Sequence, residues 1–319
     1  MGQTLNKENQ FVTGLLTTLQ QDKFSPRGWW RFLGRSWRMS RKTANDNPTL
    51  KRSWALVTVF IGILSAAILL ASFSIEGPGE TARLLPAFLF CVIWQQCDLF
   101  WHLGLNRQAL SDKLLPSVGV ANTLTWIRGL CASYLLARII GGLNTPSWLA
   151  LLVFLVGVAT DILDGQVARF TKTQSKLGQL GDGEADFCLY LALTIVLMQN
   201  NILPLWLGLV IFSRFCVPLI AALVSYFIFA HPLRFGSTTW GKYAGLAQCL
   251  YFFLLLTPPQ FAPFAQPLNL PLLVATLILL IAAPLAQIAR PNVSHLLSYL
   301  VSATMLLTGQ RSQKGRTLR

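Results

Sequence analysis

Charged residues, and acidic ones above all, are scarce in this chain. Of its 319 residues, 12% are Asp, Glu, Lys or Arg, and 12 residues are acidic. The six cysteines lie within apolar runs and lack the spacing of metal ligands, and none of the three histidines pairs with a plausible nucleophile. There is no glycine-rich phosphate loop of the nucleotide-hydrolase type. The sequence therefore argues against a disulfide scaffold, a zinc centre, a histidine-activated nucleophile and a P-loop enzyme.

Hydrophobic residues make up 53% of the chain, and several uninterrupted apolar runs approach the roughly 20 residues that cross a bilayer core. The sequence therefore predicts an all-α polytopic membrane protein with about eight transmembrane helices. The expected spans are 54–73, 84–101, 124–142, 147–164, 183–200, 203–229, 243–257 and 268–289. A ninth apolar run, 296–307, is short and follows Arg290 and Pro291. We therefore expect it to lie at the membrane–water interface or to be a bent continuation of the preceding span, and not to cross the membrane.

The charges of the predicted loops indicate an orientation. If the N-terminus is cytoplasmic, the expected outer loops are 74–83, 143–146, 201–202 and 258–267, and they hold Arg83 as their only cation. Apart from the arginines inside the expected spans, the other basic residues lie in the remaining loops and the two terminal segments, as the positive-inside rule requires. We therefore expect an integral membrane protein, of the inner or plasma membrane if bacterial, with both termini in the cytoplasm. The net charge of +14 then needs no nucleic-acid partner.

Residues 1–53 form a basic segment in which tryptophan and phenylalanine alternate with arginine. The segment contains ten Lys and Arg against three Asp and Glu. It favours either a helix on an anionic lipid surface or a disordered arm that only sets the topology. We interpret 40–52 as a linker and find no cleavable signal peptide. Residues 54–117 are expected to add two extra transmembrane helices and their connecting loop.

Four aspartates stand where one predicted span ends and the next begins. Asp161 and Asp164 are three residues apart, and Asp182 and Asp186 are four apart, so each pair shares one face of a helix. Where two such helices meet, the four carboxylates need a counter-charge. Hard oxygen ligands select Mg²⁺, Mn²⁺ or Ca²⁺ over zinc, and paired divalent ions are a recurrent device for displacement at phosphorus, for which we expect Mg²⁺ or Mn²⁺.

The full pattern is D-x2-D-G-x2-A-R-x8-G-x3-D-x3-D, which fixes eight residues over 26 positions from Asp161 to Asp186. It resembles the signature of the CDP-alcohol phosphatidyltransferase family at every position. The resemblance implies a catalytic domain over 118–309, with six of the eight helices as its core, followed by a basic cytoplasmic tail, 310–319. It also implies two divalent ions held by all four aspartates, with Asp186 as the general base.

Further site residues follow from the same resemblance. Asn122, Thr125 and Arg128 form an N-x-x-T-x-x-R pattern, similar to one that family members often carry in the preceding span. Ionisable groups inside spans tend to face a polar cavity. We expect the CDP portion to be bound by Asn122, Thr125, Gly165, Ala168, Arg169 and Gly178. We expect the acceptor to be bound by Arg128, Arg214 and Lys242.

The implied reaction moves a phosphatidyl group from a CDP-alcohol to an alcohol acceptor and releases CMP. CDP-diacylglycerol with a small polar or phosphorylated acceptor is favoured over CDP-choline or CDP-ethanolamine with diacylglycerol. The expected partners are these substrates and membrane lipids, with a homodimer left open. A cation-coupled transporter is the alternative from another class, but it predicts carboxylates at mid-membrane and a two-fold repeat.

Overall fold

The computed structural model describes residues 6–109, 111, 113–229 and 239–288. The fold is helical, and these residues contain no β-strand beyond isolated bridges. The helices are α1 (Asn6–Gln21), α2 (Pro26–Asp46), α3 (Pro48–Glu76), α4 (Pro78–Trp101), η1 (Leu103–Leu105), α5 (Gly119–Ile140), α6 (Ser147–Phe170), α7 (Lys176–Gln199), α8 (Leu205–Phe229), α9 (Thr239–Leu255), η2 (Pro259–Phe261) and α10 (Ala262–Ile288). The chain divides into two compact units at Leu233 and Arg234, so α1 to α8 belong to the first and α9 and α10 to the second.

The predicted polytopic membrane fold is confirmed. Each of the eight expected spans falls mainly on one helix from α3 to α10. Residues 141–142, 200, 203–204 and 256–257 lie just beyond the helix ends, and residue 289 lies outside the described residues. Among the residues that the structure describes, four helical segments are long and apolar enough to cross a bilayer: Pro48–Glu76, Pro78–Trp101, Ser147–Phe170 and Pro263–Ala283. The expected interfacial run, 296–307, and the tail, 310–319, also lie outside the described residues. Which side of the membrane the termini occupy stays a prediction.

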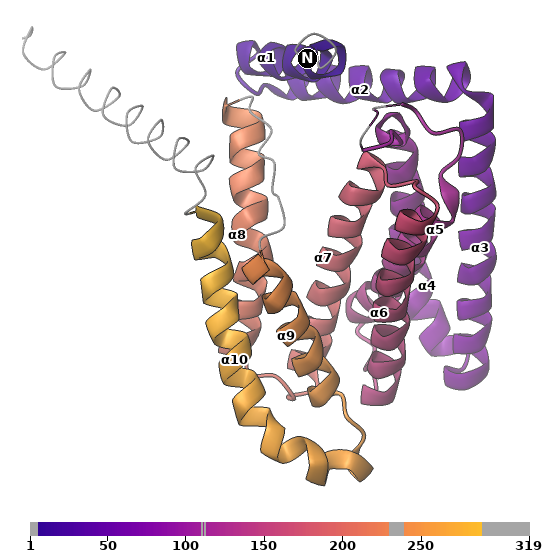
Figure 1. The fold of residues 1–319 in the computed structure, drawn as a ribbon. Coiled ribbons are helices and arrows are strands. Elements are labelled where there is room, and N and C mark those ends of the chain that lie inside the picture. Colours follow the sequence, from indigo (N-terminus) through magenta and orange to yellow (C-terminus); the bar gives the residue numbers. More distant parts are fainter. Residues whose placement is uncertain (1–5, 110, 112, 230–238, 289–319) are drawn as a thin grey trace, which may run out of the picture. The chain divides into compact units, whose positions relative to one another are not determined.

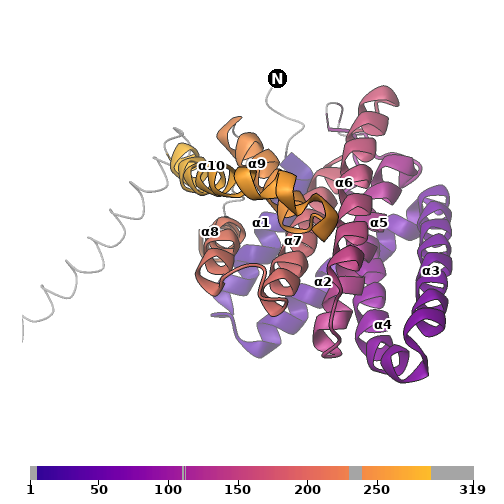
Figure 2. The same cartoon turned by 90° about the horizontal axis from the view of Figure 1, so that it is seen from below.

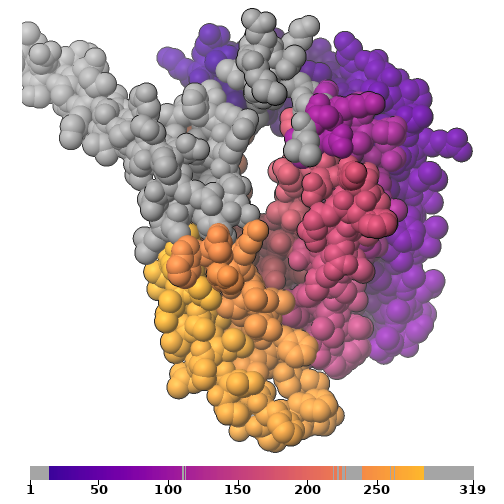
Figure 3. Space-filling model, in the orientation of Figure 1, coloured from indigo at the N-terminus to yellow at the C-terminus, as the bar shows by residue number. Residues whose placement is uncertain are grey.

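Helix α5 forms the centre of the first unit. Its largest interfaces are with α7, α6 and α4, and α4 and α6 lie on different sides of it (Figures 1 and 2). Twelve of its residues are buried, including Arg128 and Arg138. In the space-filling view, side chains of α6 form part of the front surface of this unit (Figure 3). Helix α5, which carries Arg128, is therefore packed against α6 and α7 and, on another side, against α4.

Arg138 stabilises α5 far from the signature residues. Its Nη1 donates hydrogen bonds to both carboxylate oxygens of Glu76, at 2.6 and 2.8 Å, and Nε donates to Thr145 at 3.3 Å. The guanidinium also lies over the ring of Tyr134. A buried arginine with a carboxylate partner from α3 is a structural tie between these helices.

The N-terminal segment is helical, which supports the first of the two alternatives for it. Helix α2 lies crosswise to α3 at the ends of the bundle helices (Figure 1). Trp37 packs on Phe100 and Trp101 at the end of α4, whereas Trp30 is 77% exposed. Binding of this helix to anionic lipid stays a prediction.

The expected linker over 40–52 is wrong. Helix α2 continues to Asp46 and α3 starts at Pro48, so Asn47 alone separates the two helices. Proline fits the first position of a helix, where its missing N–H has no partner to lose. Pro78 begins α4 in the same way, after Gly77 has turned the chain at a φ of +89°.

Candidate active site

The signature residues lie on two helices that both pack against α5. Asp161, Asp164, Gly165, Ala168 and Arg169 belong to the second half of α6, and Gly178, Asp182 and Asp186 belong to the first half of α7. The intervening turn ends at Ser175, whose hydroxyl accepts a hydrogen bond from the N–H of Gly178 at 3.0 Å and caps α7. The sequence analysis missed Ser175, although a serine directly before a helical run is a recognisable N-cap signal.

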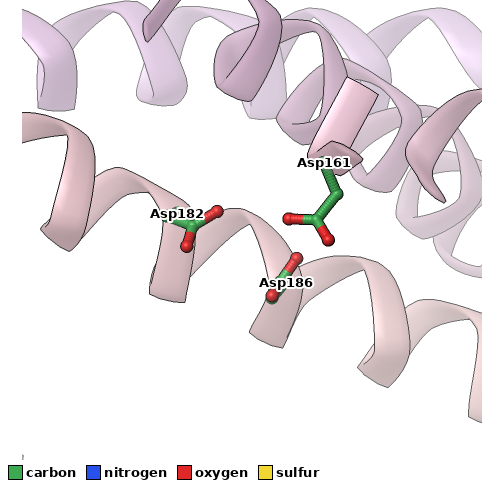
Figure 4. Close-up of side chains that lie close together, drawn as sticks. All are labelled: Asp161, Asp182 and Asp186. Atoms are coloured by element: carbon green, nitrogen blue, oxygen red, sulfur yellow. The ribbon is translucent and has the colours of Figure 1, made fainter. Parts of the chain in front are cut away.

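Three of the four aspartates converge. Carboxylate oxygens of Asp161, Asp182 and Asp186 all lie within 4.8 Å of one another. Figure 4 shows Asp161 reaching from one helix toward Asp182 and Asp186, which stand one turn apart on the other. The predicted pairing of two helix faces is therefore present.

Asp164 lies deeper than the other three. It is 8% exposed, and its Oδ2 accepts hydrogen bonds from the Thr125 hydroxyl at 2.8 Å and from Arg128 Nη2 at 2.9 Å. Both donors come from α5. Thr125 therefore orients one carboxylate of the cluster, which its position in the sequence pattern alone does not show.

Arg128 is the counter-charge of the cluster. Its side chain is 1% exposed, and its two terminal nitrogens contact all four aspartates. Nη1 donates to Asp161 and, at 2.5 Å, to Asp186, while Nη2 donates to Asp164 and Asp182. The planar fork of a guanidinium suits such a four-way contact, which a lysine ammonium cannot reproduce in the same geometry.

A cavity of about 260 Å³ lies beside the cluster and is lined by residues of α5, α6, α7 and the turn before α7. Every residue predicted to bind CDP contributes to its wall: Asn122, Thr125, Gly165, Ala168, Arg169 and Gly178. Asp164 and Asp182 line it as well. The structure thus joins the aspartate cluster to a polar cavity built from the remaining signature residues.

Gly178 permits the closest packing in this cavity. A Cβ at this position would lie 2.6 Å from Oδ1 of Asn122, a distance that real Cβ contacts do not show. The same Asn122 donates through Nδ2 to the carbonyl of Val118 at 2.7 Å and to the Ser175 hydroxyl at 3.3 Å. Asn122 therefore joins the start of α5 to the start of α7, and only glycine leaves room for it.

The residues predicted to bind the acceptor lie on three helices, α5, α8 and α9. Arg128 contacts the aspartates, as described. Arg214 belongs to α8, and its guanidinium lies 5.1 Å from the ring centroid of Phe215, which packs on Phe187, the residue after Asp186. Lys242 is exposed on α9 in the second unit. The acceptor roles of all three stay predictions.

Comparison with known proteins adds the decisive observation. The sequence model of the CDP-alcohol phosphatidyltransferase family matches residues 118–288, more than half of the chain. The chain belongs to the CDP-alcohol phosphatidyltransferase family. This confirms the resemblance drawn from the signature, and membership in a family of transferases leaves the transporter alternative without support.

One curated relative is a cardiolipin synthase (CMP-forming) of Streptomyces coelicolor. It is 42% identical over 74 residues, which are 23% of this chain and 34% of the relative. The match thus spans about a third of the relative's length. No solved structure matches the chain. Helices α1 to α4 lie outside the part of the chain that the family model covers.

The cluster fits the divalent metal ions on which this family depends. Its donors are carboxylate oxygens, the ligands that Mg²⁺ and Mn²⁺ prefer, and three of them are close enough to share an ion. Asp161 and Asp182 have half-exposed side chains, so a metal can reach them from the cavity side.

Proposed function

We propose that this chain is an integral membrane phosphatidyltransferase. It takes a phosphatidyl group from a CDP-alcohol, passes it to the hydroxyl of an acceptor and releases CMP. The observation that carries the proposal is the convergence of Asp161, Asp182 and Asp186 beside a cavity lined by all six expected CDP-binding residues. The family match and the name of the CMP-forming relative support the same reaction class.

The site residues are proposed to bind the nucleotide and the metal ions. Asn122, Gly165, Arg169 and Gly178 orient the nucleotide, with the Arg169 guanidinium contacting the diphosphate. Two divalent ions, held by the four aspartates, would stabilise negative charge on the phosphoryl oxygens. Thr125 holds Asp164 in position for that role.

Asp186 is the proposed general base. Its carboxylate takes the proton as the acceptor oxygen bonds to the β-phosphorus, while the bond from that phosphorus to the CMP oxygen breaks and the electron pair leaves with CMP. Its side chain is 36% exposed, so an acceptor hydroxyl can approach it. A base must lie within hydrogen-bond reach of the proton that it takes, and its place one turn from Asp182 puts it beside the phosphate.

The donor is proposed to be CDP-diacylglycerol and the metal Mg²⁺ or Mn²⁺. The acceptor is proposed to be a phosphorylated alcohol, because Arg214 is an arginine inside a predicted span, near the residue that follows Asp186. A CDP-choline or CDP-ethanolamine donor with diacylglycerol is the alternative. With the cytoplasmic orientation predicted from the loop charges, soluble nucleotide and metal reach the site directly.

An acceptor screen tests these assignments. Purified protein in liposomes receives Mg²⁺, labelled CDP-diacylglycerol and one alcohol at a time, among them glycerol 3-phosphate, inositol phosphate, phosphatidylglycerol, serine and free inositol. A parallel series receives CDP-choline or CDP-ethanolamine with diacylglycerol, and products are identified by mass spectrometry. We expect a new phospholipid with a phosphate-bearing acceptor. Turnover with serine or free inositol alone would remove the case for Arg214, and turnover only from CDP-choline or CDP-ethanolamine would establish the alternative donor.

Arg128 is expected to stabilise the protein chiefly when metal is absent. Arg128→Gln leaves four carboxylates without their counter-charge, so the thermal unfolding midpoint should fall in EDTA and recover in large part in excess Mg²⁺. The variant should also bind Mn²⁺ more tightly than wild type, because the guanidinium no longer competes for the same oxygens.

Arg138→Gln is the matched control, since Arg138 is equally buried and paired with Glu76 away from the cluster. It should lower the midpoint equally in EDTA and in Mg²⁺. Unfolding midpoints measured by intrinsic fluorescence for both variants decide the question. A metal-independent loss in Arg128→Gln would show that the arginine serves packing alone.

A further inference from the structure

A second cavity lies along a different stretch of α5 from the nucleotide cavity, and the two cavities share no lining residue. It measures about 550 Å³ and is walled by α4, α5 and α7. Phe90 and Trp94 of α4, Trp126 and Leu136 of α5, and Ala185 and Cys188 of α7 provide most of its apolar surface. Ligand pockets typically measure about 300–1,000 Å³. Because α4 lies outside the family match, this cavity is a feature that the N-terminal extension adds to the family's core.

The cavity is polar at one end and apolar at the other. Asp98 and Glu184 interact electrostatically across the polar end, and Cys91 and Cys188 line the cavity farther along the same two helices. Seven residues separate Cys91 from Asp98, about 10 Å of helix. Leu136 lies about 15 Å along α5 from Trp126, which is bonded to Gln95 near the acidic end. The shape suits an amphiphile with its head at Asp98 and its chain beside Cys91.

Gln95 presents an unsatisfied acceptor at this cavity. Its side chain is 93% buried, since 7% remains exposed, and its Nε2 donates to the carbonyl of Trp126 at 2.6 Å. This bond fixes the orientation of the amide, because the reversed amide would place its oxygen against the carbonyl oxygen. Oε1 then has no hydrogen-bond partner among the described residues, and buried acceptors are rarely left in that state. A ligand hydroxyl or ammonium would supply the missing donor.

The charges at the polar end favour the same kind of head. The carboxylate of Asp98 contacts Nδ1 of His102 at 3.1 Å. Burial acts to lower the pKa of the His102 imidazole, but the hydrogen bond and charge of Asp98 and the charge of Glu184 outweigh burial and raise this pKa above its ordinary value. The residues that line the cavity include no Lys, Arg or His. An anionic head therefore has no counter-charge on the wall, whereas a donor head finds two carboxylates and an amide oxygen.

We propose that this cavity binds a membrane amphiphile whose aliphatic chain lies between α4, α5 and α7 and whose head donates hydrogen bonds to Gln95, Asp98 and Glu184. The chain enters from the lipid side, where Trp94 is 65% exposed on a helix that is apolar and long enough to cross a bilayer. The site is independent of the transfer reaction, because it needs neither CDP-alcohol nor metal. It gives the N-terminal extension a role in lipid binding.

The test uses the full chain, delipidated in detergent and without metal or CDP-alcohol. A diazirine-bearing monoacylglycerol is photo-crosslinked to it, the labelled peptides are mapped by mass spectrometry, and unlabelled monooleoylglycerol, oleylamine and oleic acid are added as competitors. We expect labels on α4, α5 and α7 at the cavity. Competition should be at least 10-fold stronger for monooleoylglycerol or oleylamine than for oleic acid, about the factor that a favourable hydrogen bond to a charged group supplies. The stronger of the first two identifies the head as hydroxyl or ammonium.

Two variants and a control decide the outcome. Cys91→Phe fills the apolar part and should weaken binding by at least about 10-fold, because each methylene kept out of an apolar site forfeits roughly a fourfold factor. Gln95→Leu removes the amide acceptor but keeps Asp98 and Glu184, so it should weaken binding of monooleoylglycerol and oleylamine and reduce, without abolishing, the preference over oleic acid. Cys97→Phe, at an exposed position on the same helix that does not line this cavity, should bind as wild type does.

Unchanged labelling in Cys91→Phe, labels that map elsewhere, or equal competition by oleic acid would overturn the proposal. So would a stable dimer that covers α4 and excludes all three probes. None of these results depends on whether the chain transfers phosphatidyl groups, so the two proposals fail separately.

Discussion

Asp182→Ala is expected to reduce CMP release to background while the protein stays folded. Asp182 supplies an oxygen to the three-carboxylate cluster and also lines the nucleotide cavity, so its loss removes a shared metal ligand. Its side chain is 48% exposed, and truncation therefore opens no cavity in the packed helices. CMP release from labelled CDP-diacylglycerol measures the activity, and circular dichroism with gel filtration measures the fold.

Asp46→Ala is the matched control for this change. Asp46 is an exposed carboxylate at the end of α2 and does not belong to the cluster, so its loss should leave CMP release unchanged. Substantial turnover by a folded Asp182→Ala variant would show that the cluster is not required for the reaction. The same pair of measurements applies to Asp161→Ala, for which we expect the same result.

Asp186→Asn is expected to lower kcat by about 10²–10⁴-fold, the usual contribution of a general base. The amide keeps the size of the side chain and one oxygen, but it cannot accept the acceptor's proton. Binding of the CDP-alcohol, measured by competition with a labelled CDP-alcohol, should weaken far less than kcat falls.

Asp46→Asn controls for the loss of a carboxylate as such and should leave kcat unaltered. If Asp186→Asn turns over at close to the wild-type rate, the proton is taken by another group. If substrate binding falls as much as kcat, the loss reflects metal or substrate binding by Asp186 and gives no support for its role as the base.

The helices could be predicted from sequence because the signal for them is local. An apolar run of span length stays apolar whatever it packs against, and the eight expected spans accordingly coincide with α3 to α10. The failure at 40–52 has a local cause as well. Pro48 lies inside that range, and it occupies the first position of α3, where proline is favoured.

The site was predicted as a set of residues but not as a geometry. The spacing of the aspartates gave their helix faces, and three of them do converge. Spacing could not show that Arg128 lies among all four, because that depends on the packing of α5 between two other helices. The sequence pattern also predicted the same metal-binding role for all four aspartates. In the structure Asp164 differs, because it accepts a hydrogen bond from Thr125 and is the most buried of the four.

The second cavity, between α4, α5 and α7, could not be predicted from the sequence at all. Gln95 and Asp98 stand in an apolar run that contains no motif, and Glu184 lies between two signature aspartates. Nothing in their order along the chain brings them together. They meet because α4 and α7 pack on neighbouring faces of α5, a relation that arises only in the folded molecule.

The most direct measurement of the central claim is the metal dependence of phosphatidyl transfer. Purified protein in liposomes is assayed for CMP release from CDP-diacylglycerol with its acceptor, first in Mg²⁺, then in excess EDTA, then after Mg²⁺ or Mn²⁺ is returned. The account predicts release in Mg²⁺, none in EDTA, and full recovery when the metal is restored, since Arg128 keeps the four carboxylates together in the meantime. Full activity in excess EDTA would contradict it.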